Sequence, residues 1–129
     1  MTSRQRVLVI DDDVMFGRVV ARMLAPDHDV VTLTSGREAL ARIGTGERFA
    51  LILCDVMMPQ VTGIDVYNRI SVIAPELVDR VVFVSAGGFT PEAHVFLMQP
   101  HLHQIEKPFA LVTFRQTVAE HLRRLARQR

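Results

Sequence analysis

Residues 7–13 read VLVIDDD, four apolar residues of strand length that end directly in three aspartates. A second apolar run, LILCD at residues 51–55, ends the same way. Runs that are apolar throughout, rather than alternating with polar residues, are typical of strands buried on both faces of a parallel sheet. Ligands bind at the carboxyl ends of such strands, so the residues that follow each run are the candidates for chemistry.

Three further apolar runs have strand length and are bounded by polar or turn residues: 30–33, 81–84 and, more weakly, 102–105. Between the runs, apolar residues recur at helical spacing. The predicted helices run from 14 to about 25, from a cap at Ser35 to 43, from a cap at Thr62 to just before Pro75, from a cap at Thr90, and from about 109 into the tail. Five strands alternating with five helices predict an α/β domain with a parallel sheet, right-handed crossovers and helices on both faces.

The composition fits a single globular domain. Of the 129 residues, 49% are hydrophobic and 22% are charged, and the formal net charge is +1. This near balance argues against general nucleic-acid binding by charge, and one cysteine, Cys54, rules out an internal disulfide and a cysteine-based zinc cluster. No apolar run has the length of a membrane span or a signal peptide. We therefore expect a soluble cytoplasmic protein with no membrane insertion.

The ends of the predicted strands carry side chains that can act together. Three aspartates, residues 11–13, follow the first strand, Asp55 ends the third, Ser85 follows the fourth and Lys107 follows the fifth. Carboxylates held this close repel one another unless a cation joins them, and an all-oxygen set suits Mg²⁺. A lysine and a hydroxyl facing the same point suit a phosphoryl group. The pattern predicts phosphoryl transfer to an aspartate, with metal and lysine neutralising the developing charge.

Four motifs in this order resemble the receiver domain of two-component response regulators. They are Asp11-Asp12, the segment 53–59 with Gly63, Ser85-Ala86, and Lys107-Pro108-Phe109. The resemblance implies a flavodoxin-like, doubly wound (βα)5 fold with a five-stranded parallel sheet in the order 2-1-3-4-5. It also implies a single receiver domain over residues 1–129, with its core at about 6–125 and no output domain in this chain.

The same resemblance implies roles for the acidic residues. Asp55 would accept a phosphoryl group from a histidine kinase or a histidine phosphotransfer protein. Mg²⁺ would be bound by Asp12, Asp55 and the backbone carbonyl of Met57, with Asp11 acting through a water molecule. The module would be a phosphoacceptor that dephosphorylates itself slowly, and not a turnover enzyme. The module would not bind nucleic acid directly. Whether it forms a weak homodimer is left open.

Phosphate contact would come from Ser85, the backbone N–H of Ala86, and Lys107. A cis Lys107–Pro108 bond is also implied. Ser85 would share the switch with position 104, where many receivers carry an aromatic ring and this chain carries Gln104. Without that ring we expect only a modest conformational change, as in receivers of hybrid histidine kinases and phosphorelays.

The resemblance also implies that the positions two residues after the phosphorylated aspartate and two residues after the serine flank the hydrolytic water. Here these positions are the apolar Met57 and Gly87, which has no side chain. Neither can orient this water or take its proton, which predicts a long-lived phosphoryl group.

Two other functions fit parts of the pattern. A phosphatase resembling the haloacid dehalogenase superfamily would use Asp11 as its nucleophile, but the only acid beyond Lys107 is Glu120. A degenerate receiver would serve only as an interaction surface, although the acid, serine and lysine set argues against it. Asp13 is better explained as a helix N-cap than as a chemical group, and Cys54 as a small buried hydrophobe.

Overall fold

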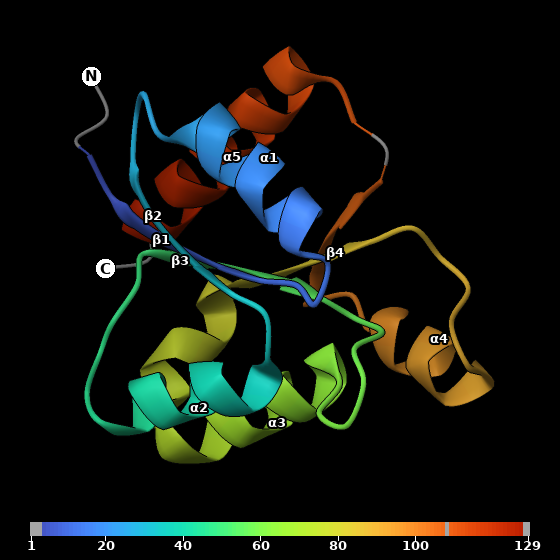
Figure 1. Cartoon of the computed structure of the whole chain (residues 1–129). Coiled ribbons are helices and arrows are strands. Elements are labelled where there is room, and N and C mark those ends of the chain that lie inside the picture. The colour runs from blue at the N-terminus through green and yellow to red at the C-terminus, as the bar shows by residue number, and fades with distance from the viewer. Residues whose placement is uncertain (1–3, 108, 128–129) are drawn as a thin grey trace.

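The centre of the molecule is a five-stranded sheet (Figure 1). The computed structural model describes residues 4–107 and 109–127. The strands are β1 (Arg6–Ile10), β2 (Asp29–Leu33), β3 (Leu51–Asp55), β4 (Val81–Ser85) and β5 (His103–Glu106). All neighbouring strands pair in parallel, in the order β2-β1-β3-β4-β5. The predicted fold and strand order are therefore confirmed.

Helices cover both faces of the sheet (Figure 1). They are α1 (Val14–Leu24), α2 (Gly36–Gly44), α3 (Gly63–Ile73), α4 (Pro91–Leu97) and α5 (Leu111–Ala126), with a 3₁₀ helix, η1, at Pro75–Arg80. On one face α1 and α5 pack against alternate strand residues such as Val7 and Val9. On the other face α2, α3, η1 and α4 pack against residues such as Leu8 and Ile10. Burial on both faces explains why the strands are apolar throughout.

Side-chain caps fix where α1 and α3 begin. Asp13 accepts hydrogen bonds from the backbone N–H groups of Met15 and Phe16, at 3.0 and 3.2 Å, so its predicted capping role is confirmed. Thr62 and Asp65 cap α3 reciprocally, each accepting from the other's backbone N–H. Asp13 lies three residues after the end of β1, whereas Thr62 follows the loop that leaves β3, so both helices begin on the side of the sheet where these strands end.

The chain passes very close to itself where β3 leads into α3. The backbone N–H of Gly63 donates to the carbonyl of Val56 at 2.8 Å. A β-carbon at Gly63 would lie far inside van der Waals distance of the carbonyl oxygen of Asp55. In the same loop Gln60 has a φ of 67°, a left-handed conformation that is unusual for a residue other than glycine. The position of Asp55 therefore depends on a tightly folded loop.

Several elements differ by a residue or more from the predicted boundaries. β5 extends to Glu106 because this residue pairs in register with Ser85 of β4. α5 begins at Leu111 rather than near 109, after Ala110 in an extended conformation. The segment after Pro75 forms the 3₁₀ helix η1, whereas the proline predicted only the end of the preceding helix. Within the residues that the structure describes, no helix is long and apolar enough to cross a membrane.

Candidate functional site

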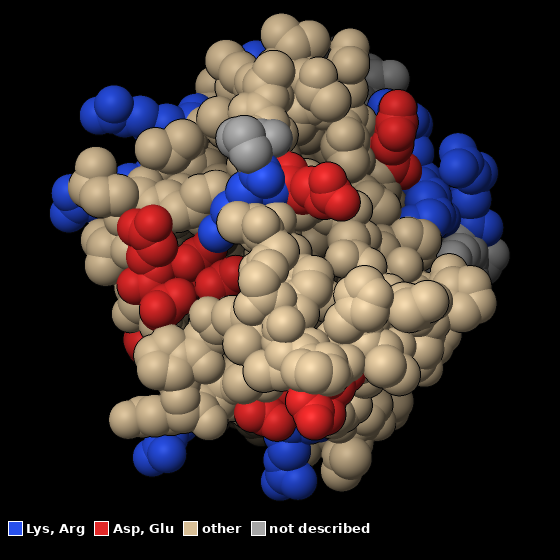
Figure 2. All heavy atoms as spheres, turned by 90° about the vertical axis from the view of Figure 1, so that its right-hand side faces the viewer, with Lys and Arg blue, Asp and Glu red and all other residues tan. Residues whose placement is uncertain are grey.

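Three carboxylates meet at the carboxyl edge of the sheet. Asp11 and Asp12 directly follow β1, and Asp55 ends the neighbouring strand β3. Each offers an oxygen, and these oxygens lie within 4.8 Å of one another. The side chains of Asp11 and Asp55 are only 2% and 14% exposed, whereas Asp12 is exposed. Figure 2 shows acidic side chains gathered on this face of the molecule, with a basic side chain close to them.

The ammonium group of Lys107 lies among these carboxylates. Its Nζ is 2.9 Å from Oδ2 of Asp11 and 3.9 Å from Oδ1 of Asp55. The backbone N–H of Lys107 donates to the carbonyl of Ser85 at 2.8 Å, which places the lysine beside the end of β4. Ser85 itself is 5% exposed. Lys107 is the only lysine in the chain, so every other basic side chain apart from histidine is an arginine.

The two buried carboxylates differ in how fully their oxygens are occupied. Asp11 accepts from the backbone N–H of Asp13 with Oδ1, at 2.9 Å, and from Lys107 with Oδ2. Asp55 accepts from the backbone N–H of Val56 with Oδ1, at 3.0 Å. Among the described residues, none donates a hydrogen bond to Oδ2 of Asp55. Asp55 thus keeps an oxygen available for a ligand, and Asp11 does not.

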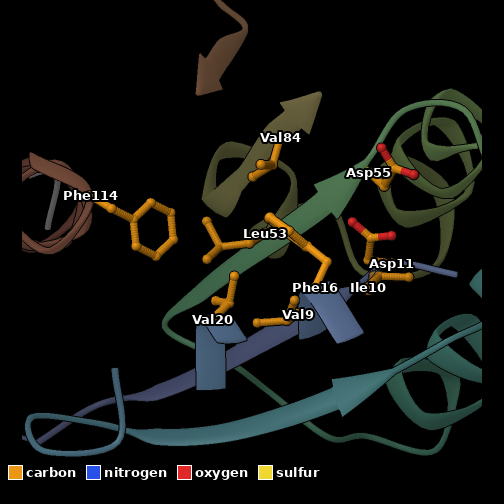
Figure 3. Close-up of a pocket in the computed structure, with 9 residues that line it drawn as sticks. All are labelled: Val9, Ile10, Asp11, Phe16, Val20, Leu53, Asp55, Val84 and Phe114. Carbon is orange, nitrogen blue, oxygen red and sulfur yellow. The ribbon is translucent and has the colours of Figure 1, made fainter. Parts of the chain in front are cut away.

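Beneath the carboxylates lies a narrow apolar cavity that does not admit a water molecule. Figure 3 shows Asp11 and Asp55 side by side at one end of it and Phe114 at the other. Burial of the Asp55 carboxyl group is the main reason why its pKa is raised to about 6. The negative charge of Asp11 also raises this pKa, and the positive charge of Lys107 lowers it. An all-oxygen donor set with an unrelieved excess of negative charge fits a hard divalent cation such as Mg²⁺.

A sequence model of the response regulator receiver domain matches residues 7–119. The chain belongs to this family. Two curated relatives come from Dictyostelium discoideum. The 3',5'-cyclic-nucleotide phosphodiesterase regA is 39% identical over 71 residues, which cover 54% of this chain and 9% of the relative. Hybrid signal transduction histidine kinase H is 23% identical over 107 residues, which cover 80% of this chain and 8% of the relative. The chain thus spans less than a tenth of either relative.

Solved structures of receiver domains share the fold. The CheY-like receiver domain from Methanospirillum hungatei JF-1 has a TM-score of 0.85 at 22% identity, covering 98% of this chain and 100% of that one. The receiver domain of a putative Luxo repressor from Vibrio parahaemolyticus has a TM-score of 0.81 at 24% identity, covering 97% and 95%. The protein is therefore a two-component receiver domain with the flavodoxin-like architecture expected from its motifs.

The remaining predicted site residues follow the ends of β3 and β4 or lie on β5. Met57, in the loop after β3, is 40% exposed, and Ala86 is exposed directly after Ser85. Gln104 is exposed on β5, and its side-chain amide donates to the carbonyl of Leu97 at the end of α4, at 2.9 Å. The expected cis bond between Lys107 and Pro108 falls on Pro108, which lies outside the described residues. Cys54 is fully buried, as predicted.

Two features of the receiver domain were missed by the sequence analysis. The ring of Phe16 lies against Lys107, with Nζ 3.8 Å from the ring centroid. Phe16 is one of the apolar residues at helical spacing from which α1 is predicted, but no spacing signal links residue 16 to residue 107. Likewise, His121 of α5 and His103 of β5 form an edge-to-face ring pair with centroids 5.2 Å apart. The stripe of apolar residues along α5 gave no sign of it.

The raised pKa of Asp55 predicts a pH-dependent stability. In the folded receiver domain this pKa, about 6, lies above its ordinary value of 3.8, so the folded state holds the proton more tightly than the unfolded chain. The contribution of Asp55 to stability therefore declines as pH rises from about 4 to 6. Without divalent cations, we expect Asp55→Asn to gain about 1–2 kcal/mol over wild type across this range, after allowance for partial access of water. Urea unfolding of both proteins at several pH values measures the difference.

The contribution of His121 to stability changes with pH in the opposite direction, but comparing wild type with Asp55→Asn removes this contribution. Burial, and then the charge of Arg124, lowers the pKa of His121 to about 4 from 6.5, so its contribution to stability is lost as pH falls through this window. Both proteins carry His121, so its effect cancels in their difference. A difference in unfolding free energy that stays constant from pH 4 to 7 would contradict the account given for Asp55.

Proposed function

We propose that the receiver domain accepts a phosphoryl group on Asp55 in a Mg²⁺-dependent reaction. The observation that carries this proposal is the geometry around Asp55. One of its carboxylate oxygens has no hydrogen-bond donor among the described residues, and the carboxylate lies beside two further carboxylates and the only lysine of the chain. An oxygen of Asp55 would form a bond to phosphorus while the bond from phosphorus to the donor's histidine nitrogen breaks. The electron pair of that bond would leave with the imidazole.

Asp12, Asp55 and the backbone carbonyl of Met57 would hold the metal, and Asp11 would reach it through a water molecule. The donor set supports this assignment because the carboxylates of Asp11 and Asp55 share a site with too little positive charge. Once bound, the cation would neutralise charge that develops on the phosphoryl oxygens.

Phosphate contact is proposed for Ser85, the backbone N–H of Ala86, and Lys107. Ser85 and Lys107 belong to adjacent strand ends, and the hydrogen bond between their backbones keeps them together. The ammonium group would leave Asp11 for the phosphoryl oxygens, because an added dianion outweighs a carboxylate that a metal already neutralises.

The phosphoryl donor would be a histidine kinase or a histidine phosphotransfer protein, and partner binding would carry the signal onward. This function implies the cytoplasm, where ATP supplies such kinases. One curated relative is itself a hybrid histidine kinase, which supports a phosphorelay setting. Slow self-dephosphorylation, rather than turnover, is supported by Met57 and Gly87, neither of which offers a group to activate water.

Treatment with acetyl phosphate tests the proposal. We expect intact-mass analysis to show one added phosphoryl group in the presence of Mg²⁺. Its formation should be slower by about a hundredfold or more in EDTA, since a bound cation contributes several kcal/mol to such transfers. Peptide mapping should place the group on Asp55. Absence of label with Mg²⁺ would favour a degenerate receiver, and equal labelling in EDTA would contradict the metal dependence.

A further inference from the structure

We infer that Phe16 is a positioning residue that holds the ammonium group of Lys107 beside Asp55, an inference that rests on the proposed function. Nζ of Lys107 lies 3.8 Å from the centroid of the Phe16 ring, which is contact with the ring face. The side chain of Lys107 is only 20% exposed. A partly desolvated ammonium group gains more from a π face than a fully hydrated one does.

The ring of Phe16 is held in place by its own neighbours. Phe109 contacts Phe16 edge to face, with ring centroids 5.9 Å apart and planes at 70°. Phe109 in turn stacks on Phe114 at 4.2 Å, and Phe114 is 1% exposed in the core beneath α5. At the other end, the backbone N–H of Phe16 donates to the cap residue Asp13. The ring face is thus fixed from both α1 and the core before any ligand arrives.

Two kinds of group attract Lys107 in this site, and only one of them would be altered by the metal. The carboxylate of Asp11, 2.9 Å away, would be screened by a bound divalent cation. The face of Phe16 neither titrates nor ligates a metal. It would therefore keep the ammonium group in the site while its partner changes from Asp11 to the phosphoryl oxygens on Asp55. This arrangement reduces the cost of ordering a flexible side chain at the moment of transfer.

The single lysine makes the contact directly measurable. Labelling with ¹³C,¹⁵N-lysine gives one side-chain signal, and the Phe16 ring current should shift the ε-methylene protons of Lys107 upfield. Phe16→Leu keeps an apolar side chain but removes the π face. We expect it to move this signal toward the position of free lysine and to slow phosphorylation by acetyl phosphate about three- to tenfold. Mg²⁺ affinity should not fall, because Phe16 offers no metal ligand.

Phe16→Tyr is the conservative variant because it keeps an aromatic ring. It should show the same upfield lysine signal and the same rate of phosphorylation as wild type. In a Lys107→Gln background, Phe16→Leu should cause no further loss of rate, since the group it positions is gone. The inference would be overturned if wild type and Phe16→Leu were phosphorylated at equal rates, or if Phe16→Tyr slowed the reaction as much as Phe16→Leu. It would also be overturned if Phe16→Leu caused the same loss of rate in the Lys107→Gln background. If wild type takes no phosphoryl group, the proposed function fails, and an unshifted lysine signal would separately overturn the contact.

Discussion

Asp55→Asn is expected to abolish phosphoryl labelling of the receiver domain. An amide oxygen is not a nucleophile of useful strength, so the substitution removes the attacking group while keeping its size. Asp11 cannot replace it, because its side chain is 2% exposed and both of its oxygens are engaged, one by the Asp13 backbone and one by Lys107. Intact-mass analysis after acetyl phosphate and Mg²⁺ should show unmodified protein under conditions that label wild type fully.

Asp13→Asn is the matched control for this experiment. It makes the same chemical change two residues after Asp11, but asparagine caps a helix about as well as aspartate does. Because Asp13 caps α1 through its side chain, we expect this variant to fold and to be labelled like wild type. A label that persists in Asp55→Asn would point instead to Asp11 as nucleophile, as in a phosphatase of the haloacid dehalogenase type.

Gly63→Ala is expected to destabilise the receiver domain by more than about 3 kcal/mol, the upper end of the range for overpacking. The added β-carbon would collide with the carbonyl oxygen of Asp55 and lie 3.0 Å from Cα of Val56. Both are backbone atoms, so no side chain can rotate away to relieve the contact. Either α3 or the end of β3 must move. Urea unfolding measures the loss, and phosphorylation should also slow because Asp55 is displaced.

Gly44→Ala provides the comparison. Gly44 is the last residue of α2, and a β-carbon there would meet no atom within 4 Å. Alanine is the better helix former, so this variant should be as stable as wild type or gain up to about 1 kcal/mol. If the two alanine variants unfold at the same urea concentration, steric contact at Gly63 is not the reason for its glycine.

The fold was largely predictable because most of its strands can be recognised from their apolar composition. Continuous apolar runs located β1 and β3 to within one residue, and Asp13 marked the start of α1. The errors fell where tertiary contacts decide the outcome. β5 is the least apolar strand, and its end is set by pairing with β4 rather than by its own residues. The 3₁₀ helix after Pro75 likewise packs Leu77 into the core, which local sequence does not reveal.

The residues that form the site could be predicted from the sequence, but the contacts between them could not. Parallel strands bring their carboxyl ends to one edge, so the nearness of Asp11, Asp55 and Lys107 followed from topology alone. Which carboxylate the lysine contacts did not follow. Its closer approach to Asp11 depends on side-chain packing between residues 96 positions apart. The contact between Phe16 and Lys107 could not be predicted either, since an aromatic residue on the apolar side of a helix usually belongs to the core.

Cys54 immediately precedes Asp55 in β3 and is fully buried, and its Sγ is 3.3 Å from the Asp55 carbonyl. Burial raises the pKa of this thiol, so almost none of it is present as the reactive thiolate in the folded protein. It is also the only thiol in the chain. Its side chain belongs to the core beneath α2, α3 and α4, so an alkylating reagent can reach it only when this helix layer opens away from the sheet. The rate of cysteine alkylation thus reports how often the core opens beside the strand that carries the proposed phosphoacceptor, with no engineered probe.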